Sequence, residues 1–201
     1  MPNDLATFQN GYAFKSKDWV ESGYPVVKIG DVKPGIIDLS GCSFVHENTV
    51  IGLERFQLHR GDLLVGMTGY VGETGLVPHH YLTAYVNQRV GRIFPNEGVK
   101  GAGFIYCLVR NPLFKLFAEA QSHGSAQANV SGSSLLSYSS IIPSDKILFQ
   151  FNNTLAPIIN TILSNYEQTQ TLASLRDTLL PRLISGQLRL PDVDLGVEAH
   201  L

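Results

Sequence analysis

Four glycines near the middle of the chain have a spacing that could form a loop around a phosphate group. Gly66, Gly69, Gly72 and Gly75 recur at every third position, and glycine lets a backbone come close to phosphate oxygens. The Lys-Ser or Lys-Thr pair of a P-loop does not follow, and the spacing differs from that of a dinucleotide-binding fingerprint. The glycines therefore predict tight turns and bulges between strands, with close approach to a nucleic-acid phosphate as the alternative.

Two histidine-containing segments were candidates for metal binding or catalysis, and neither supplies a complete set of groups. His79 and His80 are adjacent, so their side chains diverge, and no third ligand follows at a suitable spacing. His123 lies near Ser125, but there is no Gly-x-Ser-x-Gly turn and no ordered base with its orienting group. We therefore expect no metal, no cofactor and no catalytic residue.

Two other segments carry groups that suit a nucleic acid. The tripeptide Asn-Gln-Arg at 87–89 stands between two strand-like runs. Arg and Gln read guanine and adenine edges through paired hydrogen bonds, although they also satisfy backbone groups at sheet corners. Lys15 and Lys17 alternate with aromatic residues, which favours either phosphate contacts or a solvated turn over a buried Trp19.

Composition indicates one sizeable domain with an appendage. The 201 residues are 44% hydrophobic, with a net charge of −2. Residues 1–143 hold eleven basic and eleven acidic residues, so charge alone decides nothing about DNA. No apolar run is long enough for a membrane span, and the first residues do not resemble a signal peptide. Cys42 and Cys107, far apart in the sequence, predict buried free thiols in a reducing cytoplasm.

Residues 1–143 have the mixed pattern of an α+β domain around a curved, mostly antiparallel sheet. Strands are expected at 24–30, 62–65, 84–86 and 91–94. Helical pieces are expected at 103–108 and 112–121, separated at Asn111-Pro112 and burying Phe104, Leu108, Phe114 and Phe117. Residues 122–134 read as a polar loop.

Residues 144–186 predict a long amphipathic helix that begins after Pro143, with Ser144 as its N-cap and Pro157 kinking or splitting it. At 1.5 Å per residue it would extend about 55 Å. Residues 187–201 form a tail. One apolar stripe needs a partner surface, most simply a second such helix, with packing onto the chain's own domain as the alternative. The seam would consist of Phe151, Leu155, Ile158, Ile162, Tyr166, Leu172, Leu175 and Leu179.

Taken together, these segments resemble the DNA specificity subunits of type I restriction–modification systems. The matching segments follow the order of that family and cover nearly the whole chain. They are Asn10-Gly-Tyr-Ala-Phe-Lys-Ser16, Gly23-Tyr-Pro-Val-Val-Lys-Ile-Gly-Asp31, Gly61-Asp-Leu-Leu-Val-Gly-Met-Thr-Gly69, Asn87-Gln-Arg-Val90, Gly124-Ser-Ala-Gln127 with Asn129, Ile142-Pro143 and Leu179-Leu-Pro-Arg-Leu-Ile-Ser-Gly186.

The resemblance implies a non-catalytic subunit that reads double-stranded DNA for modification (methyltransferase) and restriction subunits. A full-length member resembles two such units in tandem, so this chain looks like a half subunit, either natural or truncated. The family pattern implies that the chain pairs with a second copy or another specificity half through antiparallel helices. Each globular domain of residues 1–143, called the head below, would then read a half-site in the major groove.

The resemblance also suggests where DNA would lie. Lys15 and Lys17 are expected to contact phosphates, with Thr68, Tyr70, Arg89, Gln127 and Asn129 near the groove. The alternative is a structural dimeric adaptor whose head binds protein, an interpretation that the sequence pI of about 6.3 favours. A positive concave face on residues 1–143 would distinguish DNA recognition from the adaptor.

Overall fold

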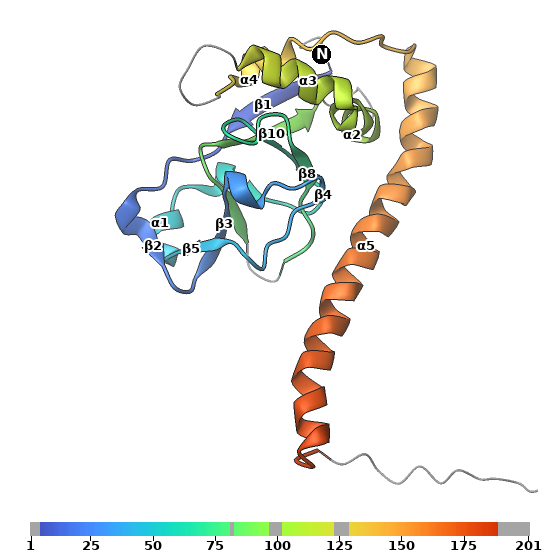
Figure 1. The fold of residues 1–201 in the computed structure, drawn as a ribbon. Coiled ribbons are helices and arrows are strands. Elements are labelled where there is room, and N and C mark those ends of the chain that lie inside the picture. Colours follow the sequence, from blue (N-terminus) through green and yellow to red (C-terminus); the bar gives the residue numbers. More distant parts are fainter. Residues whose placement is uncertain (1–4, 81–82, 97–101, 123–128, 189–201) are drawn as a thin grey trace, which may run out of the picture. The chain divides into compact units, whose positions relative to one another are not determined.

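The computed structural model describes residues 5–80, 83–96, 102–122 and 129–188, which form strands followed by helices (Figure 1). The strands are β1 Ala6–Asn10, β2 Trp19–Val20, β3 Tyr24–Val27, β4 Gly35–Ile36, β5 Ser43–Val45, β6 Gln57–Leu58, β7 Leu63–Gly66, β8 Thr74–Leu76, β9 Ala84–Val86 and β10 Val90–Pro95. The helices are α1 Glu47–Val50, α2 Ala102–Arg110, α3 Pro112–Gln121, α4 Gly132–Leu136 and α5 Asp145–Ile184, with 3-10 turns η1 Ser16–Asp18, η2 Ile29–Asp31 and η3 Glu54–Phe56. Two compact units result, residues 1–163 and 164–201.

The strands form two five-stranded sheets, in the orders β1-β10-β7-β8-β4 and β2-β5-β3-β9-β6. The β3–β9 and β4–β8 pairs are parallel, and the other described pairs are antiparallel. The predicted α+β class with mostly antiparallel pairing is confirmed. The prediction of a single sheet is wrong, because the short strands β2, β5 and β6, which the sequence pattern did not indicate, build a second sheet around β3 and β9.

Strand β7 shows how the first sheet is buried on both faces. Leu64 packs in a core with residues of the second sheet, including Val26 and Val86. Its neighbours Leu63 and Val65 point to the opposite face and belong to a second core, which α2, α3 and the first part of α5 cover. The first sheet is therefore the middle layer of the head, and β7 is apolar on both sides.

The two helical pieces predicted at 103–108 and 112–121 are confirmed as α2 and α3. They separate at Asn111, whose side chain accepts a hydrogen bond from the Leu113 N–H at 2.9 Å, with proline in the first turn of α3. The predicted burial was partly wrong: Phe114 is fully buried, whereas the other three predicted residues are half-buried. The remaining buried positions described on these helices are Gly103, Ile105, Val109 and Ala118.

Part of the predicted loop 122–134 is helical. Helix α4 follows Ser131, whose hydroxyl accepts a hydrogen bond from the Ser134 N–H at 3.0 Å. This N-terminal cap explains why a serine-rich segment begins a helix. Residues 123–128, which include Gln127, lie outside the described residues.

Helix α5 begins next to Ser144, as predicted, and continues through Pro157 without a break. The expected split is therefore absent. Proline removes one helical N–H, so the carbonyl of Asn153 loses its partner. Asn153 is exposed, and water can satisfy that carbonyl without interrupting the helix.

The first part of α5 packs on the head, within the first compact unit. Leu148, Asn152 and Leu163 are buried there, and the Asn152 side-chain oxygen accepts a hydrogen bond from the Phe104 N–H of α2 at 2.8 Å. The Arg60 guanidinium donates to the side-chain and main-chain oxygens of Asn160 at 3.0 and 3.2 Å. The first compact unit thus includes the beginning of α5, as far as Leu163.

This packing predicts that the helix stabilises the head. Leu148 is 3% exposed and its neighbour Ile147 is 55% exposed, so the two positions form a matched pair. Leu148→Ala is expected to lower the free energy of unfolding by about 2–5 kcal/mol through lost burial and a cavity. Ile147→Ala should change it little. Equal urea midpoints for the two variants would contradict the packing of α5 on the head.

Candidate nucleic-acid interface

The glycine-rich segment forms a tight, well-connected turn between β7 and β8. The Gly66 N–H donates to the Glu73 carbonyl at 2.8 Å, and the Gly72 N–H donates to the Gly66 carbonyl at 3.0 Å. Gly69 and Gly72 have φ values of +75° and +78°, which side chains larger than hydrogen rarely adopt. The predicted turn is confirmed, and it holds Tyr70 at its tip.

Helix α3 anchors this turn. A Cβ atom on Gly72 would lie 2.9 Å from Cβ of Ala118 and 3.1 Å from Cα of Lys115, so the backbone of the turn rests directly on the helix. The Lys115 ammonium forms an ion pair with the Glu73 carboxylate, and this hydrogen bond raises the pKa of Lys115. The turn is therefore fixed to the core before any ligand arrives.

Three segments far apart in the sequence meet beside this turn. The Met67 N–H donates to the Arg89 carbonyl at 3.0 Å, and the Val130 N–H donates to the Met67 carbonyl at 2.9 Å. The Thr68 hydroxyl and the Asn129 side-chain oxygen are 3.0 Å apart. The structure thus brings Thr68, Arg89 and Asn129 close together. The sequence analysis expected all three near the DNA groove.

The side chains in this cluster differ in what they can reach. Tyr70 is 62% exposed, and Arg89 and Asn129 are also exposed. An exposed guanidinium can bind a guanine edge or a phosphate, and an exposed aromatic ring offers a polar hydroxyl. Thr68 is buried and already hydrogen-bonded to Asn129. Its geometry suits orientation of Asn129 better than direct contact with a ligand.

The tripeptide at 87–89 combines the two roles considered for it. Asn87 is buried, and its N–H donates to the Val27 carbonyl at 3.0 Å while its carbonyl accepts from the Val90 N–H at 2.9 Å. Asn87 therefore completes a sheet corner. The next two residues, Gln88 and Arg89, are exposed and remain available for a ligand.

Lys15 and Lys17 lie on a different element from the Tyr70 turn. Both are exposed on or beside η1, where the Lys15 N–H donates to the Asp18 carboxylate at 2.7 Å. Trp19, the first residue of β2, is half-buried, and the Lys28 ammonium lies 3.5 Å from its ring centroid. The alternative interpretation, a solvated turn over a buried Trp19, is met only in part, because Trp19 packs against the core from β2 at the edge of its sheet.

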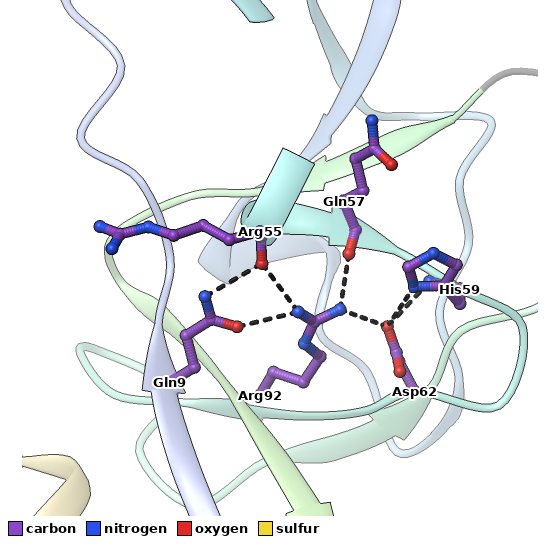
Figure 2. Close-up of polar contacts among 6 residues, drawn as sticks. All are labelled: Gln9, Arg55, Gln57, His59, Asp62 and Arg92. Atoms are coloured by element: carbon purple, nitrogen blue, oxygen red, sulfur yellow. Dashed lines mark hydrogen bonds and ion pairs between the residues drawn. The ribbon is translucent and has the colours of Figure 1, made fainter. Parts of the chain in front are cut away.

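Arg92 is a polar residue of the head whose role the sequence analysis missed. It is 5% exposed on β10, and Figure 2 shows its guanidinium surrounded by oxygen atoms. It donates to the Gln57 carbonyl (2.5 Å), the Asp62 carboxylate (2.7 Å), the Gln9 side chain (2.8 Å) and the Arg55 carbonyl (2.9 Å). Arg92 therefore connects the first sheet to β6 and η3. A charged residue inside the strand predicted at 91–94 was the available signal.

The remaining sequence predictions concern metals, thiols and membranes. Across the ranges that the structure describes, no group of three or more His, Cys, Asp or Glu side chains could hold a metal ion. Cys42 is buried, and burial raises its pKa, but Cys107 is exposed on α2, so its predicted burial is wrong. Within the same ranges, no helix has the length and apolar character needed to cross a membrane.

The chain matches the family model described as "Type I restriction modification DNA specificity domain" over residues 3–176. It belongs to this family. The type I specificity domain is 29% identical over 119 residues to the type I restriction enzyme HindI specificity subunit of Haemophilus influenzae. It is 32% identical over 90 residues to the MjaIX specificity subunit of Methanocaldococcus jannaschii. These alignments cover 59% and 45% of this chain, but 26% and 20% of the relatives.

A solved structure shares the fold of this specificity domain. The crystal structure of the type I restriction–modification S subunit from M. genitalium superposes with a TM-score of 0.52 at 18% identity. The superposition covers 94% of this chain and 44% of that one. The specificity domain described here therefore spans less than half of that relative's chain.

Proposed function

We propose that this chain is a non-catalytic DNA-recognition subunit of a type I restriction–modification complex. The observation that carries the proposal is the anchored turn: exposed Tyr70, Arg89 and Asn129 surround a turn that α3 holds in place. Rigid presentation of polar groups is what direct readout of base edges requires. The family match supports DNA rather than a protein as the ligand, and so favours this role over that of an adaptor.

We further propose that the head reads one half-site in the major groove, with Lys15 and Lys17 near phosphates. Direct readout needs contacts to base edges, whereas phosphate contacts position the protein. Lys17 lies on η1 and Lys15 directly before it, on a different element from the Tyr70 turn. Such a separation suits two kinds of contact, to phosphates and to base edges. Gln127 stays in this proposal as a groove residue, although it lies outside the described residues.

Helix α5 would connect two heads and receive the catalytic subunits. Its exposed apolar residues are unusual for a surface that faces water alone: Phe151, Ile158, Ile162, Leu172, Leu175 and Leu179 are 39–65% exposed. Leu155 and Tyr166 of the predicted seam are half-buried. We propose antiparallel pairing with a second copy or another specificity half. Methyltransferase and restriction subunits would dock on the helices, in the cytoplasm, where the DNA is.

Arg89 provides the test of the recognition surface. On a duplex carrying the preferred sequence, Arg89→Ala is expected to weaken binding by about 1–3 kcal/mol and to reduce discrimination against altered base pairs. Fluorescence anisotropy on preferred and altered duplexes measures both effects. Arg110→Ala, which removes an exposed guanidinium from α2, is the control. Unchanged affinity and discrimination in Arg89→Ala would remove Arg89 from the interface.

The two lysines should behave differently from Arg89. Replacing Lys17 with alanine is expected to weaken binding to all duplexes alike and to reduce the slope of log K against log salt by roughly 1. The measurement is a salt titration of the anisotropy signal. A sequence-dependent loss, or an unchanged slope, would show that Lys17 does not contact a phosphate.

A further inference from the structure

A cavity of about 200 Å³ lies beside the Tyr70 turn, which contributes Tyr70 and Glu73 to its wall. The rest of the wall comes from residues 28–34, the connection between β3 and β4 that includes η2. This connection contributes Gly30, Val32, Lys33 and Pro34. All the lining residues except Val32 and Glu73 are exposed, so the rim of the cavity faces solvent.

The 28–34 connection joins two parts of the proposed DNA interface. It begins after β3, whose last residue, Val27, accepts a hydrogen bond on its carbonyl from the Asn87 N–H at 3.0 Å. Further along, Ile29 Cδ1 lies 2.8 Å from the position that a Cβ on Gly66 would occupy, at the base of the Tyr70 turn. The connection thus runs from the sheet corner that precedes Arg89 to the Tyr70 turn.

Backbone contacts hold this connection in place. Val32 is buried, and its N–H donates to the Ile29 carbonyl at 3.3 Å. Directly after the connection, β4 pairs in parallel with β8, with Gly35 opposite Gly75. A Cβ on Gly75 would lie 2.8 Å from the Lys33 carbonyl oxygen, so the two backbones are in close contact there. Lys33 therefore stands on a fixed backbone, and a ligand that binds it has little chain to order.

Lys33 gives the cavity a positive charge that no lining carboxylate compensates. Its side chain is exposed, and no hydrogen bond or ion pair of its ammonium is found among the described residues. The carboxylate in the lining belongs to Glu73, which forms an ion pair with Lys115. An anion that enters the cavity therefore meets the Lys33 ammonium and a carboxylate whose charge is already balanced.

Two further carboxylates, of Asp31 and Asp38, stand in the same stretch of chain, and neither lines the cavity. The Asp31 carboxylate accepts the Lys28 N–H at 2.7 Å. The Asp38 carboxylate accepts the N–H and the hydroxyl of Ser40 at 3.0 and 2.6 Å. These hydrogen bonds lower the pKa of Asp38, and the Lys33 ammonium adds to the effect. Lys33 thus acts on Asp38 without pairing with it, and its ammonium stays available to a ligand.

Gly30 leaves room for a bulky ligand at the mouth of the cavity. It is exposed, and a Cβ placed on it would meet no atom within 4 Å. Its φ lies outside the left-handed region, so neither the backbone conformation nor the packing requires glycine at this position. A glycine there lets a ligand come close to the backbone, which suits a sugar–phosphate strand.

We propose that this cavity receives a phosphate of one DNA strand, with Lys33 as its contact, beside the base edges that Arg89 reads. The inference rests on the proposed DNA recognition and adds a backbone contact to it. A single ammonium at an open cavity suits a phosphate that other contacts also hold, because phosphate contacts position a duplex while base contacts specify its sequence. Lys33 would fix the strand relative to Arg89 and Tyr70.

Alanine in place of Lys33 is expected to weaken binding to preferred and altered duplexes alike, and to reduce the slope of log K against log salt by roughly 1. Lys33→Arg keeps the charge and should keep the slope. Lys146→Ala, which removes an exposed lysine from α5, is the control. Fluorescence anisotropy of the full chain at several salt concentrations measures the slope. An unchanged slope in Lys33→Ala, or a loss that depends on the base sequence, would overturn the phosphate contact.

Gly30→Glu tests the cavity independently of Lys33. A carboxylate at the mouth would face the phosphate, and the repulsion is expected to weaken binding at least about tenfold. Gly41→Glu adds the same charge at an exposed glycine that is equally open but does not line the cavity, and it should bind nearly as the unaltered chain does. Equal affinities of the two variants would overturn the inference. Urea midpoints establish that both are folded, and if Gly30→Glu is not, the salt slope of Lys33→Ala decides.

The same measurements separate this inference from the proposed function. Loss of discrimination in Arg89→Ala, with unchanged slope and affinity in the Lys33 and Gly30 variants, would retain DNA recognition and overturn the phosphate cavity. An unaltered chain that binds all duplexes equally, with a slope that still depends on Lys33, would retain the phosphate contact and remove sequence recognition. Absence of any DNA binding would remove both.

Discussion

Replacing both Ile162 and Leu172 with aspartate is expected to convert a paired assembly into monomers. The two side chains are 43% and 65% exposed in the single chain and lie on the predicted seam. Pairing would transfer them from water to an apolar interface, where a carboxylate without a partner is strongly unfavourable. Four carboxylates would enter each two-chain seam. Sedimentation velocity over a range of concentrations measures the effect.

A matched variant separates loss of the seam from added charge. Asn153→Asp with Thr171→Asp introduces the same charge at two exposed positions of α5 that lie outside the predicted seam, and it should remain paired. If the Ile162→Asp, Leu172→Asp variant sediments as a dimer, the apolar side of α5 is not the pairing surface. Retained helicity by circular dichroism confirms that the helix itself persists.

Removal of the Arg92 guanidinium is expected to be the most destabilising single change in the head. Arg92→Met keeps much of the side-chain volume but removes a charged donor from the Asp62 carboxylate and from the Arg55 and Gln57 carbonyls. Among the described residues, Asp62 then keeps only its bond from the His59 N–H, and the Arg55 carbonyl keeps its bond from the Gln9 side chain. Breaking a buried charge pair in this way typically costs about 3–5 kcal/mol. That loss is a large part of the stability of a domain of this size.

Urea denaturation compares Arg92→Met with two other variants. Asp62→Asn removes one charge but keeps an oxygen acceptor, so a smaller loss of about 1–3 kcal/mol is expected. Arg176→Ala removes an exposed guanidinium paired with Asp177 and should leave the midpoint unchanged. A stability of Arg92→Met equal to that of the unaltered chain would show that the network does not hold the two sheets together.

Local sequence signals predicted the elements that they alone determine. The Asn111-Pro112 pair separated α2 from α3 because an asparagine cap and a proline act within one turn. Short apolar runs between turn residues gave β7, β9 and β10 nearly at their observed bounds. The long helix was predicted from the spacing of its apolar residues. Pro157 does not interrupt it, because the carbonyl that loses its hydrogen bond belongs to Asn153, which is exposed to water.

Features that depend on distant partners were not predictable in this way. Strands of two or three residues such as β2 and β6 carry too few side chains to show a period, and their pairing with β5 and β9 decides their existence. The first part of α5 has one apolar side against the head and another exposed. Residue spacing alone does not distinguish these two apolar sides. The sequence analysis therefore placed the apolar residues on one stripe and did not include Leu163, which is 1% exposed.

The grouping of the candidate interface residues was suggested by family resemblance rather than by residue chemistry. Thr68, Arg89 and Asn129 meet through backbone hydrogen bonds around Met67, a proximity that sequence separation hides. The buried state of Thr68 and the sheet-corner role of Asn87 emerged only from the structure. The charge of Arg92 inside a predicted strand was visible in the sequence, but its acceptors on Gln9, Arg55, Gln57 and Asp62 were not.

Selection from random duplex DNA tests the central claim most directly. The chain, mixed with its modification subunits, is incubated with the pool at physiological salt, and bound duplexes are recovered and sequenced over several rounds. Two identical heads predict enrichment of an inverted repeat with a constant spacer, because each copy reads the same half-site on opposite strands. Recovery of duplexes with no common sequence, from a complex that is fully assembled, would contradict the account.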